Sequence, residues 1–441
     1  MTAPKTAGSM SPGLLKVVER AKREPEGQLR SLAQLIDVQA LERAFHRLRA
    51  DAAVGVDGVS KEQYGLGLQT KLEDLHQKMK AMQWKHQPIL RRHVPKEPGG
   101  SRPIGISATE DKVVQGALTE VLGAIYEQDF LPCSHGFRPG RSAHGAIRVL
   151  DKAIHRGEIS WIYEADIKSF FDSVNRKTLE ELLQIRVADA SLMRLIGKCL
   201  HVGVLDGEQF SRPDEGTPQG SVISPILGNI YLHYALDLWF ERDIRPRLVG
   251  RALLVRYADD FVMGFERQDD AERVVAVLGK RLAKFGLTLH PDKARLMPFG
   301  HPPKDQQKGK GPGTFDFLGF TLYWARNRWG KWNIRCKTRR ARLGRAIRRV
   351  YGFCRNHRHQ PVADQHSALT SRIRGHFNYF GVNGNIRSLR LLVRHAEKAW
   401  HKWLCRRSQR ARLDWERFKD LLKDYPLPRP RIFVQIWGVV P

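Results

Sequence analysis

The sequence predicts a mixed α/β fold followed by a helical C-terminal part, on three observations. Residues 85–297 alternate short β-forming runs with amphipathic stretches. The run Leu254–Met263 is rich in strand formers and carries two adjacent acids, which predicts a hairpin. Further along the chain, Leu343, Ile347 and Val350 recur at helical spacing. With 441 residues, the chain is long enough for two or three packed units.

The individual elements follow from local patterns. Residues 1–50 are expected to form a basic N-terminal extension with a short helix around Leu14–Arg23. Trp161–Asp166 is predicted as a strand that ends in an acid and turns towards a helix. A pair of short strands is expected around Phe315–Tyr323 and Trp332–Arg335, ahead of basic helices.

Charge is unevenly distributed along the chain. Of the net charge of +29, residues 331–441 carry +21, from 27 Lys and Arg against 6 Asp and Glu, whereas residues 1–330 carry +8. Arginine prevails over lysine in the basic part, and Arg with Trp, Tyr and His suits phosphates and stacked bases. The asymmetry therefore predicts a nucleic-acid partner and disfavours a membrane surface.

Cysteine usage and hydropathy indicate the compartment. The five cysteines form no Cys-x-x-Cys pair, which argues against a zinc ribbon or a disulfide framework and for a reducing compartment. The chain lacks an uncharged apolar run of about 18 residues and a secretory signal at its N-terminus. We therefore expect no membrane partner and a cytoplasmic, bacterial location, in association with the nucleoid when the protein acts on DNA.

Three acids point to the chemistry. Asp259 and Asp260 are adjacent in an apolar run, and neighbouring carboxylates repel each other, so a bound divalent cation is the simplest compensation. A turn also favours Asp, but no Gly or Asn follows directly and β-formers continue on both sides. Asp166 ends a strand of its own. Acids at the ends of neighbouring strands are the arrangement of a two-metal phosphoryl-transfer site, with Mg²⁺ ions about 3.5–4 Å apart.

Further motifs accompany these acids in a fixed order. They are Gly55–Gly58, Arg92–Pro103, Ser134–Ser142, Gly216–Leu232, Gly286–Lys293 and Phe317–Phe320, with Ser371–Gly381 and Trp400–Arg410 in the basic part. Tyr257–Asp260 and the Asp166 segment resemble the catalytic core of reverse transcriptases. The whole set resembles the group II intron-encoded reverse transcriptases and maturases, and its order and spacing match the fingers and palm over residues 50–325.

The resemblance implies an α/β (α+β) right-hand polymerase. Residues 51–325 would be the fingers and a palm with an antiparallel sheet, and residues 326–441 an α-helical thumb that binds RNA, the maturase domain. The implied activity is RNA-directed DNA polymerisation with two Mg²⁺ ions, for which Mn²⁺ could substitute, together with assistance to splicing. The implied partners are the group II intron RNA, an RNA template with a DNA primer, dNTPs and target DNA, with the protein as a monomer or homodimer.

The resemblance also assigns site residues. The metal ligands would be Asp166, Ile167, Asp259 and Asp260. Lys293 would protonate the leaving pyrophosphate, with a solvated lysine as the alternative. Residues expected to contact the nucleotide are Lys96, Arg102, Ile167, Phe171 and Gln219. The first two flank the tip of a predicted hairpin and could converge on one triphosphate. The ring of Phe171 would collide with a 2′-hydroxyl and so select deoxynucleotides.

The primer and template would meet a further set of residues. These are Arg138, Arg141, Leu318, Gly319, Arg339, Arg340, Arg406 and Arg407. Arg138 and Arg141 would contact template phosphates or else pair with core acids. Leu318 and Gly319 lie in the motif similar to the primer grip, where glycine lets the backbone approach the primer terminus. Tyr379 lies off the apolar stripe of its predicted helix and could face either way.

Two other functions remain open. The chain could be a related reverse transcriptase recruited to phage defence or to CRISPR spacer acquisition, which the maturase-like thumb disfavours. It could also be a maturase that only folds RNA, which the three retained acids disfavour. No Cys-x-x-Cys pair follows Ile432, so an endonuclease is not expected and the primer would come from elsewhere, such as a nascent strand at a replication fork.

Overall fold

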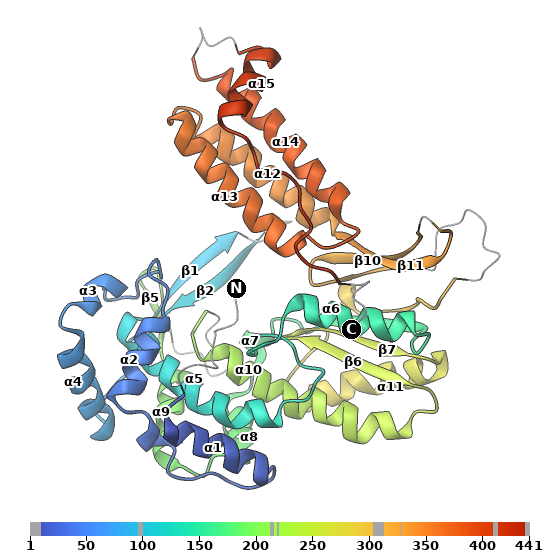
Figure 1. Cartoon of the computed structure of the whole chain (residues 1–441). Helices are drawn as coiled ribbons and strands as arrows, with labels where there is room; N and C mark the ends of the chain where they lie inside the picture. The colour runs from blue at the N-terminus through green and yellow to red at the C-terminus, as the bar shows by residue number, and fades with distance from the viewer. Residues whose placement is uncertain are drawn as a thin grey trace.

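The computed structural model describes residues 10–95, 100–211, 216–217, 220–302, 313–327, 329–408 and 413–436. Within these ranges the chain forms three β-sheets among helices, and a long helical unit stands apart at the C-terminal end (Figure 1). The prediction of a mixed α/β fold followed by helices is confirmed. Lys96 and Gln219, predicted to contact the nucleotide, lie outside the described residues.

The central sheet is antiparallel, in the order β6-β7-β3-β8. Its strands are β3 (Trp161–Asp166), β6 (Ala252–Tyr257), β7 (Asp260–Phe265) and β8 (Arg295–Pro298). Successive side chains of a strand point to opposite faces, so Phe261 and Met263 enter one hydrophobic core and Val262 enters a second one. Because helices cover one face and the strands within residues 314–338 help to cover the other, β6 and β7 are almost wholly apolar. The acids therefore stand at the open end of the sheet.

The N-terminal segment packs into the body of the protein. Helices α1 and α2 lie on α5, and Leu14 and Leu41 belong to the same core as Phe261. Ser11 and Asp37 cap these helices through their side-chain oxygens. Residues 10–50 are thus an integral part of the unit that contains the central sheet. The helices here are α1 (Pro12–Arg23), α2 (Val38–Arg47), α3 (Lys61–Gly65), α4 (Leu68–Lys80) and α5 (Thr109–Asp129).

The helices that follow enclose the central sheet. They are α6 (Ala143–His155), α7 (Phe170–Ser173), α8 (Arg176–Gln184), α9 (Ala190–Leu200), α10 (Ser224–Leu232) and α11 (Gln268–Ala283). Helix α10 continues as π-helical turns over His233–Asp237 and Trp239–Ile244. Such turns are rare and concentrate at functional sites.

A second sheet carries the hairpin that was predicted around Arg102. Its order is β2-β1-β4-β5, with β1 and β2 antiparallel. These strands are β1 (Ile89–Pro95), β2 (Ser101–Ile106), β4 (Val204–Asp206) and β5 (Gln209–Ser211). The β1–β2 hairpin points from the N-terminal helices towards the base of the C-terminal helices (Figure 1). Arg102 on β2 is close enough to the open end of the central sheet for its charge to lower the pKa of Asp259.

The third sheet corrects a predicted boundary. Its strands are β9 (Thr314–Phe317), β10 (Phe320–Arg326) and β11 (Trp332–Thr338). The boundary predicted between residues 325 and 326 falls inside β10. Phe320 and Ile334 share a core with Val262 of the central sheet, so β9–β11 pack with the preceding unit. The structural break comes at Arg339, where the last helices begin.

Within the described part of the chain after Arg339, the C-terminal helical unit consists of four helices around a core of its own. They are α12 (Arg340–Asn356), α13 (Val362–Phe380), α14 (Ile386–Leu404) and α15 (Trp415–Asp424). The predicted stripe is confirmed, because Val350 is buried while Leu343 and Ile347 pack against the same core. Phe377 and Trp400 are buried in this core. Among the described residues, no helix has the length and apolar character needed to cross a membrane.

Candidate active site

The three predicted acids lie at one end of the central sheet. Asp166 on β3 is directly opposite Asp260 on β7, and Tyr257 pairs with Asp260 across the β6–β7 hairpin. Asp259 therefore occupies the two-residue turn together with Ala258. Residues opposite each other in an antiparallel pair have Cβ atoms about 4.5–5.5 Å apart, which brings the Asp166 and Asp260 carboxyl groups together. Ala258 has a positive φ of 56°, a conformation that strains any residue except glycine.

Mutual repulsion and burial disturb the titration of this cluster. Burial, with smaller contributions from Asp166 and Asp259, raises the pKa of Asp260 to about 7. Burial and then Asp166 also raise the pKa of Asp259, which Arg102 and Lys293 partly oppose. Lys293 forms an ion pair with Asp166 through its ammonium group. The acids thus need positive charge close by, and these two basic residues supply part of it.

The donor set fits Mg²⁺ bound together with a substrate. Within the described ranges, no three His, Cys, Asp or Glu side chains are grouped closely enough to hold a metal ion on their own. Mg²⁺ is usually held by one or two carboxylates and completes its shell with water and substrate phosphates. Asp166, Asp259 and Asp260 meet that requirement. Ile167 has an apolar side chain without a donor atom, so only its backbone carbonyl could contribute a ligand.

The segment after Asp166 approaches the Gly216–Leu232 motif. Phe170 is buried, whereas Phe171 is only partly covered. The Phe171 ring packs edge-on against the Phe170 ring, with the two centroids 5.1 Å apart. The backbone N–H of Thr217 donates a hydrogen bond to the Phe171 carbonyl at 2.7 Å. The backbone of Phe171, five residues after Asp166, is therefore held against the segment that precedes Gln219. This placement is compatible with the predicted contact of Phe171 with the nucleotide sugar.

Replacing Phe171 with Ala is expected to admit ribonucleotides. Removing the ring opens space for a 2′-hydroxyl, while the backbone bond to Thr217 is kept. We expect the ratio of kcat/KM for dNTP over rNTP to fall by about 10–200-fold, the range over which apolar size selection operates. Single-nucleotide incorporation assays with matched dNTP and rNTP measure this ratio. Phe170→Ala, which removes a core ring, provides the control, and an unchanged ratio in Phe171→Ala would refute the sugar contact.

The Leu318–Gly319 turn joins the acids to the C-terminal helical unit. Both residues have positive φ, at 51° and 81°. A hydrogen bond from the Leu318 backbone N–H lowers the pKa of Asp260 and so opposes the effect of burial. The Tyr379 hydroxyl on α13 donates to the Leu318 carbonyl at 2.8 Å, and the Arg339 N–H donates to the Gly319 carbonyl at 3.0 Å. The turn predicted as the primer grip thus contacts Asp260 directly.

Tyr379 is a site residue whose role the sequence left undecided. Its place off the apolar stripe was the available signal, because a residue off that stripe is free to contact another unit. Its ring stacks on the Phe320 ring, with centroids 5.6 Å apart. The backbone carbonyl of Tyr379 lies 2.7 Å from Nε2 of His144. The tyrosine therefore holds α13 against both the β9–β10 turn and α6.

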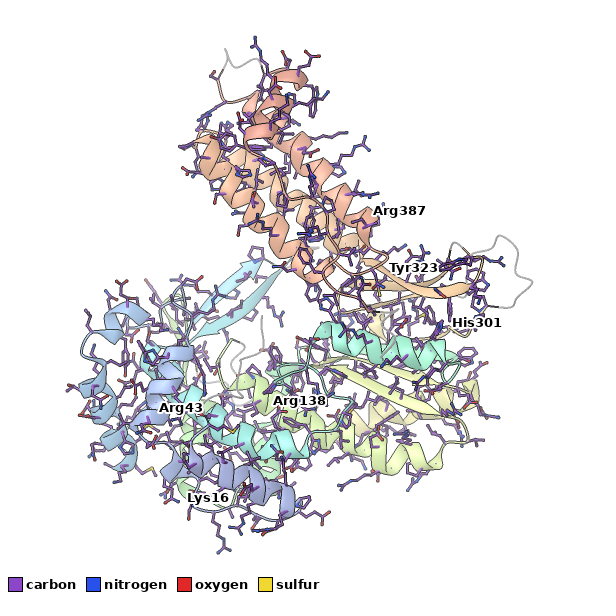
Figure 2. All side chains as sticks on the ribbon, in the orientation of Figure 1. Lys16, Arg43, Arg138, His301, Tyr323 and Arg387 are labelled. Carbon is purple, nitrogen blue, oxygen red and sulfur yellow. The ribbon has the colours of Figure 1, made fainter. Side chains whose placement is uncertain are left out.

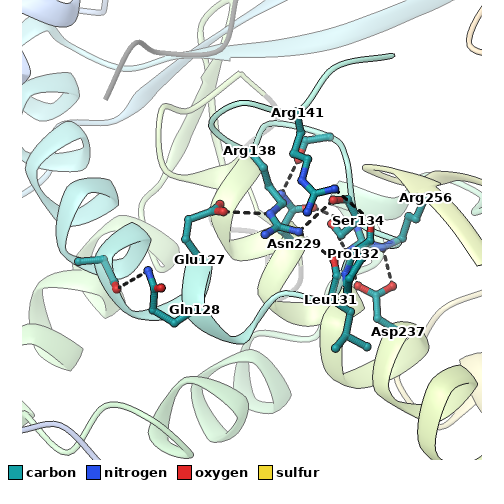
Figure 3. Close-up of polar contacts among 12 residues, drawn as sticks. Glu127, Gln128, Leu131, Pro132, Ser134, Arg138, Arg141, Asn229, Asp237 and Arg256 are labelled. Carbon is teal, nitrogen blue, oxygen red and sulfur yellow. Dashed lines mark hydrogen bonds and ion pairs between the residues drawn. The ribbon is translucent and has the colours of Figure 1, made fainter. Parts of the chain in front are cut away.

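Of the two roles expected for Arg138, the structure contains the pairing with an acid. Arg138 is 5% exposed and its Nε donates to Glu127 at 3.0 Å, while Nη1 donates to the carbonyls of Leu131 and Ser134 (Figure 3). Its charge and donors are used inside the protein. Arg141 is partly exposed and donates to the Pro132 carbonyl at 3.4 Å, so it retains donors for a phosphate.

The predicted arginines of the C-terminal part are spread over a long distance. Arg339 and Arg340 are exposed where α12 begins, and Arg339 pairs with Asp316 at 2.9 Å. Arg406 and Arg407 follow the end of α14, at the far end of the helical unit from the central sheet (Figure 1). Basic side chains also project along these helices, among them Arg387 near the base of α14 (Figure 2). The structure therefore separates Arg406 and Arg407 from the acids.

Acids at a sheet hairpin, a basic β-hairpin above them and an arginine-rich helical unit beside them define a nucleotide polymerase with a right-hand fold. The chain belongs to the reverse transcriptase (RNA-dependent DNA polymerase) family, whose model matches residues 94–322. Among the proteins it is similar to are a group II intron-encoded protein and an intron maturase. The predicted class of enzyme is thereby confirmed.

Three relatives illustrate the similarity. Protein YkfC of Escherichia coli K12 is 33% identical over 315 residues, which cover 64% of this chain and 78% of that protein. The group II intron-encoded protein LtrA of Lactococcus lactis is 34% identical over 212 residues, 46% of this chain and 35% of LtrA. Nuclear intron maturase 4 of Arabidopsis thaliana is 31% identical over 140 residues, 32% of this chain and 17% of the maturase. The matches to the last two thus cover a minor part of those longer proteins.

Proposed function

We propose that this protein extends a DNA primer on an intron RNA template at the site formed by Asp166, Asp259 and Asp260. The observation that carries the proposal is the register that sets Asp166 directly opposite Asp260, with Asp259 in the adjoining turn. Two bound Mg²⁺ ions would lower the pKa of the primer 3′-hydroxyl and stabilise the leaving pyrophosphate. In this proposal the fingers carry β1–β2, the palm is the central sheet, and the thumb is the C-terminal helical unit.

The residues of the chain would position the substrates around these acids. Arg102 faces Asp259 closely enough to affect its pKa, which suits contact with a triphosphate in the same space. Leu318 and Gly319 would hold the primer end, because their turn contacts Asp260. The ammonium group of Lys293 lies at the Asp166 carboxylate, where it could deliver a proton to the leaving pyrophosphate.

Primer extension by the purified protein tests this function. An RNA oligonucleotide annealed to a DNA primer is incubated with dNTPs and Mg²⁺, and the product is resolved at single-nucleotide length. We expect extension with Mg²⁺ or Mn²⁺, none in EDTA, and full recovery when Mg²⁺ is restored. A protein that only folds RNA would bind the template and leave the primer unextended under every condition.

The demand for Mg²⁺ is expected to rise in mild acid. In the absence of metal, Asp260 holds a proton below pH 7, because burial and the neighbouring acids raise its pKa to about 7. The metal must then displace this proton, so half-saturating Mg²⁺ should increase up to about tenfold per pH unit below 7 and level off above it. Extension rates over a Mg²⁺ titration at pH 6 to 8 measure the effect. A half-saturation that does not change with pH would contradict it.

The thumb surface supports RNA as the partner. Four cations lie within 6 Å of the centroid of the Trp403 ring. They are Arg355 at 5.8 Å, Arg358 at 5.9 Å, Lys402 at 5.9 Å and Arg406 at 5.6 Å. Among the described residues, none of these four forms an ion pair with an acid. Unpaired cations around an aromatic ring suit phosphates and bases. We infer that this surface binds the intron RNA and assists its splicing, at a distance from the primer terminus.

A further inference from the structure

A buried ion pair lies directly beneath the catalytic turn. Arg256 on β6 and Asp237, the last residue of the first π-helical turn after α10, are both 0% exposed. Nε and Nη2 of Arg256 donate to the two oxygens of Asp237 at 2.7 and 2.6 Å. Two charges taken out of water carry a large desolvation cost, and apolar residues of similar size often do as well for stability. Stability alone is therefore a weak reason for this pair.

The other donors of Arg256 connect the surrounding segments to the turn. Nη1 donates to the Ala258 carbonyl at 3.1 Å and to Asn229 Oδ1 on α10 at 2.9 Å (Figure 3). Nη2 also donates to Ser134 Oγ at 2.8 Å. The planar guanidinium presents five N–H donors in a fixed geometry, which a lysine cannot reproduce. One side chain thus fixes the turn against α10 and the Ser134–Ser142 motif.

The Ser134–Ser142 motif packs on the same turn. A side chain added at Gly136 would place its Cβ 2.4 Å from the Ala258 nitrogen, so only glycine fits there. Asn229 Nδ2 donates to the Gly136 carbonyl at 2.8 Å, and the His135 N–H donates to the Arg256 carbonyl at 2.8 Å. The motif therefore forms a backing for the turn, a role that its sequence did not indicate.

We propose that Arg256, oriented by Asp237, is a positioning residue that holds Ala258 in its strained conformation and thereby fixes Asp259 and Asp260 for metal binding. The inference rests on the proposed function. Ala258 adopts a backbone conformation that a non-glycine residue reaches only when the surroundings impose it. The Arg256 bond to the Ala258 carbonyl is the contact that imposes it from below.

A single and a double variant separate stability from positioning. Arg256→Met leaves the Asp237 charge buried and unpaired, and we expect a large fall in Tm. Arg256→Met combined with Asp237→Leu removes both charges, so Tm should recover towards that of the wild type. In the double variant we expect kcat to stay about 10²-fold low, the cost of a small displacement of catalytic groups. Half-saturating Mg²⁺ should rise, while KM for dNTP stays within about twofold.

Arg256→Lys keeps the charge and is the second test if the double variant does not fold. Its ammonium group can pair with Asp237 but cannot also hold the turn, so we again expect lower kcat with nearly unchanged Tm. Adding Ala258→Gly should recover about tenfold of the lost kcat, because glycine adopts a positive φ without the strain that other residues incur. A role confined to stability would give no such recovery.

Arg186 provides a matched control. It is 1% exposed and pairs with Asp129 at 2.8 Å, and its remaining donors bind carbonyls of the N-terminal segment. Arg186→Met should lower Tm without changing kcat or the Mg²⁺ requirement at a temperature where it is folded. Wild-type kcat in a folded Arg256 variant, or an equal loss of kcat in Arg186→Met, would overturn the positioning role. Absence of extension by the wild-type protein would instead overturn the proposed function.

Discussion

Replacing Asp259 with Asn is expected to abolish primer extension and leave RNA binding intact. Asparagine keeps the size of the side chain but removes the negative charge on which a divalent ion depends. Losing a metal ligand costs several kcal/mol of transition-state stabilisation, so we expect kcat to fall by about 10³-fold or more. Gel-shift binding of the template at fixed salt should change less than about twofold. Single-turnover extension on an RNA template measures the loss.

Asp292→Asn is the control for this substitution. Its side chain is 89% exposed and adjoins Lys293, so it lies near the site without belonging to the acid cluster. We expect wild-type extension from this variant. Extension that persists in Asp259→Asn would remove Asp259 from the metal site, and equal losses in both variants would point to a general effect of surface charge.

Neutralising the cations around Trp403 is expected to weaken RNA binding strongly. Changing Arg355, Arg358, Lys402 and Arg406 to Gln removes four charges that have no acidic partner among the described residues. Each lost phosphate contact lowers the slope of log K against log salt by about 0.7 to 0.9, so the slope should fall by roughly 3. Filter binding of the intron RNA between low and moderate salt measures this slope. Extension of a primer on a short template at low salt should persist.

A variant with the same change in net charge separates local contact from overall field. Arg242, Arg247, Lys280 and Lys284 are exposed on the part of the chain that holds α11, away from the C-terminal helices. Their replacement by Gln should leave the slope near that of the wild type. Equal reductions in the two variants would show that net charge, and not the surface at Trp403, governs the binding of RNA.

Local patterns predicted much of the fold. The strand at Trp161–Asp166, the hairpin at Leu254–Met263 and the stripe of Leu343, Ile347 and Val350 were all found, because each depends on residues close in sequence. The domain boundary was misplaced because the amino acids at residues 325 and 326 do not show that β10 pairs with β11 and shares the core of the central sheet. Long-range pairing decides such boundaries.

The same contrast applies to the site. Sequence patterns alone showed that three acids exist in strand contexts that disfavour them, that the C-terminal part carries most of the positive charge, and that the motifs are those of a reverse transcriptase. These properties depend on composition, spacing and order. The three-dimensional arrangement was needed to show that Asp166 faces Asp260, that Tyr379 holds the Leu318 turn, and that Arg256 lies buried under Ala258. Burial and hydrogen-bond partners come from segments far apart in the chain, which no local pattern specifies.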